Sequence, residues 1–370
     1  MSFGLKAKAP FACYSQLPEK NDMIFSSLKR GGSMEAKRIV LETKCIVDIG
    51  KSITGQCIKN LFSGTGKLSK IAVVTDREVG GYYLKGFLEQ FDAIGLKPAV
   101  IMIDGSQTAK TIEAVKTVYE RLMDIDFSEA DILIALGGGG VIDITAFSAS
   151  TFGTGAKYIL FPTTMLSMIE STVAPRAMLN FQSQKDLIRV SVSPYHVVID
   201  TAFLKTLPPR FMANGIAQVL QYGLTDSPSL LNRLSNPGDL AELVEESLQA
   251  GIRIRKDSPE LLRFGRDIAD AIEGHFRFLK YTQGESLALG LFAMDPSPAL
   301  HSLYERLGLP RELTGVTKET LLKRIMKTFE KQGDMVLITR IGPESKPAIQ
   351  KVTVDAAERF FDTLLTGICH

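Results

Sequence analysis

Four consecutive glycines, Gly137 to Gly140, form the first feature of this 370-residue sequence that suggests chemistry. They stand in ILIALGGGGVIDITAF, where an apolar strand leads directly into the glycines and the pattern predicts a helix immediately after them. The first N–H groups of a helix are unpaired and lie at the positive end of its dipole. Beside a surface without side chains, this arrangement suits a diphosphate, although four glycines can also form a simple tight turn. The run matches neither GxGxxG nor the Walker A pattern, so neither of those nucleotide sites is indicated.

Two glutamines three positions apart are the second feature. Gln218 and Gln221 lie in GIAQVLQYG, residues 215 to 223, where a helix would place both amides on one face among apolar neighbours. A buried amide without partners costs about 1–3 kcal/mol. We therefore expect these amides to face a polar cavity or to bond groups from elsewhere in the chain.

The charge balance excludes several classes of partner. The 43 basic and 41 acidic residues give a net charge of +2 without a long run of one sign, so neither a nucleic acid nor a membrane surface is an expected partner. The four cysteines, Cys13, Cys45, Cys57 and Cys369, are scattered and predict neither a zinc site nor a disulfide framework. The N-terminal MSFGLKAKAPFACYS lacks the apolar core of a signal peptide, so we expect a cytoplasmic protein.

The first half of the chain alternates strands and helices. Its apolar β-rich runs are predicted at Lys70–Thr75, Lys97–Ile103, Asp131–Leu136 and Tyr158–Phe161. The segments between them carry apolar residues at helical spacing, as in AKTIEAVKTVYERLM. Repeated β-α-β units with continuous apolar strands predict a Rossmann-like α/β domain whose parallel sheet is covered on both faces.

The pattern changes after Pro208 and Pro209. Five helical segments follow, with one short strand candidate at Met335–Arg340. We therefore expect an α/β domain over residues 1–208 and a mainly helical domain over 209–370, with a substrate cleft between them.

A series of short motifs resembles the 3-dehydroquinate synthase family and the wider sugar phosphate cyclase superfamily. In order, they are IALGGGGVID, YILFPTTMLSMIESTVAPRAMLN, VVIDTAFLKTLPPR, NGIAQVLQYG, LLRFGRDIADAIE and TQGESLALG. The likeness extends from about Asp76 to Gly290 and implies a dehydroquinate synthase-like fold and a bound NAD. The family is commonly dimeric, so the resemblance also implies a homodimer.

The resemblance assigns NAD contacts to positions that are largely intact here. The matching residues are Asp76, Lys110, Gly138, Gly139, Gly140, Asp143, Thr163, Thr164, Lys185 and Thr206. Hydroxyls and lysines pair with phosphate and ribose oxygens, and carboxylates accept from ribose or amide donors. Two positions depart from the family: Ser106 stands where a Glu is usual, and Ile142 where dehydroquinate synthases have a further Gly.

The sequence departs from the family at the positions of the metal ligands. The family binds a divalent cation through a Glu and two His, and the corresponding residues here are Gln218, Arg266 and Gln283. Two amides and a guanidinium are poor metal ligands, so no metal is expected. Other substitutions surround this site: Gln221 for Lys, Asp270 for His, Arg176 for Lys, Asp186 for Asn, and Thr154 and Pro259 for two arginines that hold phosphate.

Several polar residues remain as catalytic candidates in the expected cleft. They are Arg176, Gln218, Gln221, Tyr222, Lys256, Arg266, Asp270 and Gln283. Arg266 and Asp270 are four residues apart and either form a surface ion pair or place a permanent cation in the former metal region, held by Asp270 and the glutamines. Arg176 would then bind a substrate carboxylate, and Tyr222, Asp270 and Glu170 are candidate acids or bases.

Two functional hypotheses follow. The first is a divergent, metal-independent enzyme that still uses NAD, with cyclase, lyase or oxidoreductase chemistry on a small carboxylate or polyol in specialised biosynthesis. The alternative is an NAD-binding pseudoenzyme or regulatory subunit without turnover. An ordinary 3-dehydroquinate synthase is least favoured, because its metal ligands, a lysine and its phosphate arginines would all be replaced.

Overall fold

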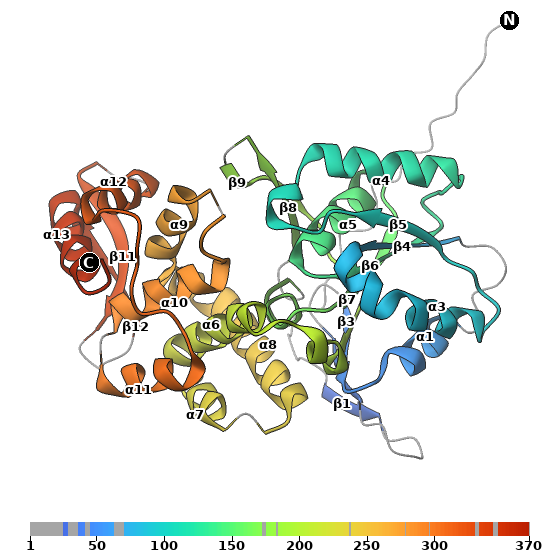
Figure 1. Ribbon diagram of the computed structural model, residues 1–370, viewed down its shortest axis with the longest axis horizontal. Coiled ribbons are helices and arrows are strands. Elements are labelled where there is room, and N and C mark those ends of the chain that lie inside the picture. Colours follow the sequence, from blue (N-terminus) through green and yellow to red (C-terminus); the bar gives the residue numbers. More distant parts are fainter. Residues whose placement is uncertain are drawn as a thin grey trace, which may run out of the picture.

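The computed structural model describes residues 25–28, 36–40, 45–62, 70–171, 175–182, 184–236, 238–277, 279–295, 297–329, 333–342 and 347–369. The segment MSFGLKAKAPFACYS, with Cys13, lies outside these residues. The described part is elongated, with a sheet and its helices at one end and the later helices at the other (Figure 1). Within it, no helix is both long and apolar enough to cross a membrane.

The main sheet of the described part has eight strands in the order β1-β2-β3-β10-β7-β6-β4-β5. Their bounds are β1 (Phe25–Leu28), β2 (Ala36–Val40), β3 (Ile46–Gly50), β4 (Ile71–Asp76), β5 (Ala99–Ile103), β6 (Ile132–Gly137), β7 (Lys157–Pro162) and β10 (His196–Asp200). All pairings from β3 to β5 are parallel, whereas β1 and β2 extend the sheet in antiparallel fashion. The predicted α/β class is confirmed, and the four predicted strands are neighbours at one end of the sheet, in the order β7-β6-β4-β5; β1, β2, β3 and β10 were not predicted.

Helices cover both faces of this sheet. They are α1 (Thr54–Phe62), α2 (Arg77–Val79), the π-turn η1 (Gly80–Leu84), α3 (Lys85–Asp92), the short 3₁₀ turn η2 (Gln107–Ala109), α4 (Ile112–Asp124) and α5 (Gly139–Thr151). Crossover connections between parallel strands are right-handed, so the direction of each connection decides which face its helix covers. The connections through α1 and α3 run along the sheet toward β5, and both helices lie on one face. The connections through α4 and α5 run away from β5, and these helices lie on the other face (Figure 1). On the first face, the Phe87 ring of α3 packs edge-on against Phe161 of β7, with 4.9 Å between ring centroids.

A separate hairpin, β8 (Arg176–Phe181) and β9 (Gln184–Ser191), packs on α5 and stands apart from the main sheet (Figure 1). It was not predicted, because its residues alternate between partly exposed and buried positions and resemble a loop in their polarity. Two further short turns follow strands of the main sheet: η3 (Ser167–Ser171) comes after β7 and η4 (Thr201–Thr206) after β10, whereas η5 (Pro259–Arg263) lies later in the chain, between helices.

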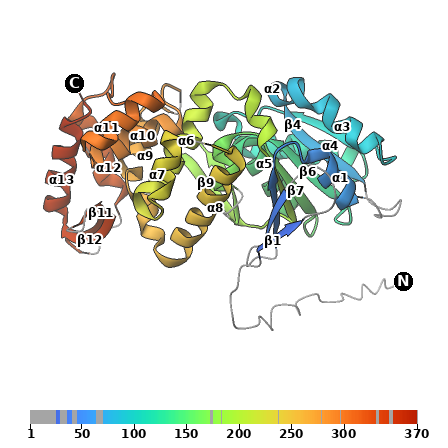
Figure 2. The ribbon, with the colours of Figure 1, turned by 90° about the horizontal axis from the view of Figure 1, so that it is seen from below.

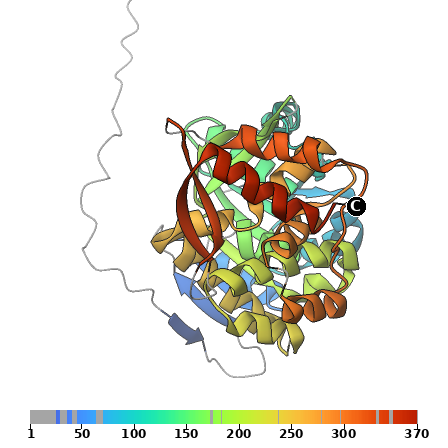
Figure 3. The same ribbon diagram turned by 90° about the vertical axis from the view of Figure 1, so that its left-hand side faces the viewer.

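The second half is mainly helical. Its helices are α6 (Pro209–Thr225), α7 (Ser229–Ser235), α8 (Leu240–Asp257), α9 (Arg266–His275), α10 (Gln283–Met294), α11 (Pro298–Leu307), α12 (Lys318–Thr328) and α13 (Val354–Thr366). Figure 2 shows α6 and α8 lying next to the sheet half. The predicted strand is β11 (Met335–Ile341), which pairs with an unpredicted partner, β12 (Pro347–Thr353), beside α13 at the far end (Figure 3).

Candidate functional site

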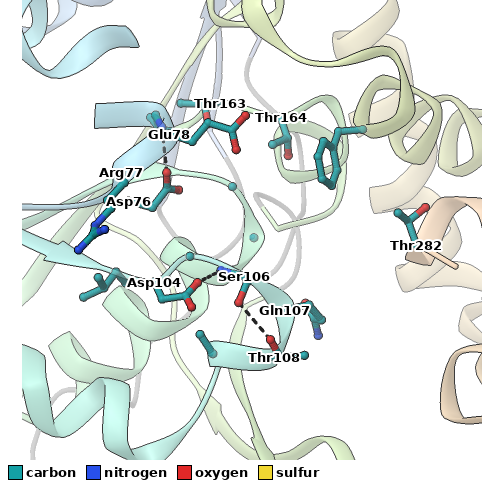
Figure 4. Close-up of a pocket in the computed structure, with 18 of the residues that line it drawn as sticks. Asp76, Arg77, Glu78, Asp104, Ser106, Gln107, Thr108, Thr163, Thr164 and Thr282 are labelled. Carbon is teal, nitrogen blue, oxygen red and sulfur yellow. Dashed lines mark hydrogen bonds between the residues drawn. The ribbon is translucent and has the colours of Figure 1, made fainter. Parts of the chain in front are cut away.

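A cavity of about 1320 Å³ opens where the carboxyl ends of the parallel strands meet the helical half. Asp76 ends β4, Asp104 follows β5, Gly138 follows β6 and Thr163 follows β7, and all four line it (Figure 4). The chain leaves β4 toward β5 but leaves β6 in the opposite direction, so the cavity lies at the topological switch point where α/β sheets bind ligands. Thr282, at the start of α10, lies on the opposite side of the cavity (Figure 4).

The glycine run forms the part of the wall where backbone approaches most closely. Gly138 is the N-cap of α5, which begins at Gly139, two residues before the start that the sequence predicted. A Cβ added to Gly140 would lie 2.1 Å from the carbonyl oxygen of Gly105, in the loop after β5. Glycine is therefore required at position 140 so that this loop can lie against the start of α5 and leave its N–H groups facing the cavity.

Gly140→Ala is expected to destabilise the protein by about 1–3 kcal/mol, the usual penalty for overpacking a well-packed core, because the added Cβ would meet backbone atoms of Gly105. Gly86→Ala is the matched control, since a Cβ at this exposed position of α3 meets nothing within 4 Å. The control should gain about 0.5–1 kcal/mol from helix propensity. Urea unfolding of both variants measures the contrast, and equal effects would show that the approach at Gly140 is not tight.

Most of the residues assigned to NAD by resemblance line this cavity: Asp76, Gly138, Gly139, Gly140, Thr163, Thr164 and Thr206. The buried Thr163 hydroxyl has no hydrogen-bond partner among the described residues. A buried hydroxyl of this kind normally bonds something, so it is a candidate ligand contact. Asp76 accepts a hydrogen bond from the Val79 backbone through one oxygen, at 2.8 Å, as the N-cap of α2.

Lys110, Asp143 and Lys185 are absent from the described cavity lining and belong to ion pairs beside it. Lys110 is 3% exposed and contacts Asp143 at 2.5 Å and Asp186 at 2.7 Å. Burial would lower the pKa of Lys110, but the two carboxylates together raise it. Lys185 pairs at 2.5 Å with Glu273 of α9, which joins the hairpin to the helical half.

The two glutamines of α6 are sealed inside the protein, 1% and 0% exposed. The Gln221 amide nitrogen donates to the backbone carbonyls of Leu262 and Phe264, at 2.9 and 2.8 Å. The Gln221 carbonyl in turn accepts from the Gln218 nitrogen at 2.8 Å, so the Gln218 carbonyl is left to face a donor. That donor is Arg266, whose Nη2 lies 2.8 Å away. These hydrogen bonds offset the cost of burying the two glutamine amides.

Glu170, in η3, is the counter-charge of this network. Its carboxylate lies 3.8 Å from the Arg266 guanidinium and accepts from the Gln283 amide at 3.2 Å. Burial would raise the pKa of Glu170, but surrounding positive charges hold it below its usual value. The cations concerned are Arg266, Arg255, Lys185 and Arg176.

The donor set does not suit a divalent cation. Within the described residues, no group of three or more His, Cys, Asp or Glu side chains is placed to hold one. At the positions that the resemblance assigns to metal ligands, the Arg266 guanidinium takes up the Gln218 oxygen, and the Gln283 amide donates to Glu170. The permanent positive charge of Arg266 repels a metal cation, and its hydrogen bond occupies the Gln218 oxygen that could otherwise be a ligand.

The other catalytic candidates lie at differing depths. Tyr222 is fully buried and accepts from Arg255 Nη1 at 3.2 Å. Arg176 is exposed at the start of β8, and Lys256 is exposed near the end of α8. Arg255, one residue earlier, faces Tyr222 and Glu170. It was not among the predicted site residues, because the sequence does not distinguish it from its basic neighbour Lys256. Of all these candidates, Gln283 alone is among the described residues that line the cavity.

Arg266 and Asp270 do not form the predicted surface ion pair among the described residues. The direct contacts of Arg266 run to Gln218 and Glu170, and Asp270 acts on it only at longer range. Protein packed around the Asp270 carboxyl raises its pKa from 3.8 to about 6, with Glu273 adding to the rise, although the side chain still reaches solvent.

Asp270→Asn is expected to stabilise the protein above about pH 6 and to have no such effect below about pH 4. A raised carboxyl pKa means that ionisation disfavours the folded state, so the penalty develops as the pH rises from 3.8 through about 6. After allowance for solvent screening, the gain is on the order of 1 kcal/mol. Urea unfolding across this range measures it, and a pH-independent difference would contradict the raised pKa.

Known proteins resemble this chain in both sequence and fold. The N-terminal family of 3-dehydroquinate synthase matches residues 100–214. The 3-dehydroquinate synthase of Clostridium acetobutylicum is 31% identical over 304 residues, covering 79% of this chain and 80% of that protein. The enzyme of the same name from Latilactobacillus sakei is 30% identical over 301 residues, covering 76% and 84%.

Solved structures of known proteins share the fold of this chain. A 2-deoxy-scyllo-inosose synthase complexed with carbaglucose-6-phosphate, NAD+ and Co2+ superposes with a TM-score of 0.73 at 17% identity, covering 88% of this chain and 99% of that one. A 2-epi-5-epi-valiolone synthase from Streptomyces hygroscopicus with NAD+ and Zn2+ bound gives 0.71 at 18% identity, covering 80% and 90%. The architecture is therefore that of the sugar phosphate cyclases. Within that superfamily, the chain belongs to the 3-dehydroquinate synthase family.

Proposed function

We propose that this protein binds NAD in the cavity at the strand ends and acts on a small carboxylate or polyol without a divalent metal. The glycine-capped start of α5 supports the diphosphate contact, because its N–H groups face the cavity at the positive end of a helix. The unpartnered Thr163 hydroxyl supports a further contact with a phosphate or ribose oxygen. Tyr82 and Met102, both exposed in the cavity wall, offer apolar surface to a base.

NAD, when bound, would supply hydride transfer, as it does in NAD-dependent enzymes generally. The chain's own residues would bind and orient it: Gly138, Gly139 and Gly140 at the diphosphate, and Asp76 at a ribose. The solved cyclases with NAD+ bound share this fold, which favours the same cofactor here.

The absence of a metal from the reaction is the divergent part of this proposal. The single observation that carries it is the 2.8 Å hydrogen bond from Arg266 to Gln218, since both residues stand where the family has metal ligands. A guanidinium remains charged at every physiological pH and can polarise or hold an anionic substrate group that reaches it. In the structure, the Glu170 carboxylate lies 3.8 Å from this guanidinium.

Calorimetric titration with NAD, followed by a substrate screen, tests the proposal. We expect NAD to bind, and we expect one or more polyols or hydroxy-carboxylates to change the near-ultraviolet absorbance of NADH or to give new products in mass spectra. Activity should be the same with and without EDTA. Loss of activity in EDTA, restored by zinc or cobalt, would overturn the metal-independent reaction, and absence of NAD binding would overturn the cofactor.

An NAD-binding protein without turnover is the alternative, and a specific observation favours it. Gln218, Gln221 and Tyr222 are buried and satisfied within the protein, so they do not reach the cavity in this conformation. NAD binding without conversion of any tested substrate would support this second function. The ordinary 3-dehydroquinate synthase reaction remains the least favoured, because its metal and phosphate positions are substituted.

A further inference from the structure

Two carboxylates, Asp143 and Asp186, bind Lys110, the lysine that the resemblance assigns to the nucleotide. Lys110 lies between Ala109 and Thr111, both of which line the cavity, yet its own side chain turns aside to Asp143 and Asp186. The Lys110 ammonium lies 2.5 Å from Asp143 and 2.7 Å from Asp186, so both carboxylates hold the same lysine. A lysine held by two carboxylates is not presented to a diphosphate in the neighbouring cavity.

The hairpin holds Asp186 in place through several fixed contacts. Asp186 has a left-handed backbone, with φ of 54°, and its N–H donates to the Asn180 side-chain oxygen at 3.0 Å. The Asn180 amide nitrogen donates to the backbone carbonyl of Gln107 at 2.7 Å, and the Asn180 N–H donates to that of Lys110. Gln107 lines the cavity, so the hairpin is fastened directly to the pocket wall.

We propose that Asp186 is a positioning residue that withholds Lys110 from the nucleotide and thereby sets a weak affinity for its diphosphate. This inference rests on NAD binding in the cavity. When Asp186 is neutral, Lys110 and Asp143 form a one-to-one pair, and the lysine is free to turn toward phosphate oxygens beside Gly138. A low affinity set in this way makes nucleotide occupancy sensitive to nucleotide concentration.

Asp186→Asn is the direct test, because asparagine accepts the left-handed backbone well and keeps the side-chain shape. Titration calorimetry with NAD should show binding on the order of three- to tenfold tighter than in the original protein, with the gain shrinking at high salt. Adenosine, which lacks phosphate, should bind equally to both proteins. Asp126→Asn is the matched control: Asp126 is an exposed aspartate with φ of 48° that lies outside the cavity lining, and its replacement should leave the affinity for NAD unchanged.

Adding Lys110→Met to the Asp186→Asn protein should remove the gain, because the gain is carried by the lysine. Equal NAD affinity in the original and Asp186→Asn proteins would overturn the inference while leaving NAD binding intact. A gain that extends equally to adenosine would also overturn it, since that result describes a general change in structure. If neither protein binds NAD, the proposed function fails together with the inference.

Discussion

Arg266→Ala is expected to lower the free energy of unfolding by about 3 kcal/mol, the effect of removing one member of a buried polar network. The change leaves the buried Gln218 oxygen without the donor it has in Arg266 and removes the cation that lies 3.8 Å from Glu170. The Arg266 side chain is 19% exposed, so solvent replaces only part of what is lost. Urea unfolding at neutral pH measures the change.

Arg253→Ala is the matched control for Arg266→Ala. Arg253 pairs with Asp226 at 2.6 Å, but its side chain is 42% exposed. Exposed ion pairs contribute less than about 1 kcal/mol. If both variants lose the same small amount, Arg266 is an ordinary surface residue and the network does not stabilise the fold.

The combined variant Gln218→Glu, Arg266→His and Gln283→His is expected to acquire a divalent metal. A carboxylate and two imidazoles are good ligands for zinc or cobalt, and the contacts of these three positions converge on Arg266 and Glu170. We expect micromolar or tighter binding, about 8 kcal/mol or more in favour of the complex, where the original protein binds none. Titration with Co2+, followed by the visible absorption of the bound ion, measures this gain.

The double variant Gln218→Glu, Arg266→His is the control for the metal site, because it lacks the third ligand and should bind Co2+ far more weakly. Circular dichroism identifies any variant that has failed to fold. Cobalt absorption in the original protein equal to that of the triple variant would contradict the assignment of these positions to a former metal site.

Continuous apolar strands made the centre of the fold predictable. The runs at β4, β6 and β7 are buried on both sheet faces, so their hydrophobicity is unbroken and easily recognised. β9 alternates exposed and partly buried residues outside the main sheet, and it is held by pairing with β8, which packs against α5. Long-range packing of this kind leaves little trace in local sequence, so the hairpin could not be predicted.

The site was predictable in its residue types but not in its contacts. The motifs assign Gln218, Arg266 and Gln283 to the family's metal positions, but they do not show that Glu170, from a distant turn, contacts both Arg266 and Gln283. Arg255 and Lys256 are adjacent in the sequence but point about 100° apart around α8, and one contacts Tyr222 while the other is exposed. Only the packing of α8 against its neighbours decides which of the two faces inward.

The most direct test of the central claim is elemental analysis of the purified protein, combined with measurement of the nucleotide released after saturation with NAD and denaturation. A metal-independent member of this family should release NAD and contain no stoichiometric zinc, cobalt or manganese, because Arg266 stands where the resemblance places a metal ligand and bonds Gln218. Stoichiometric metal that is removed by chelators, with NAD binding dependent on it, would contradict the account.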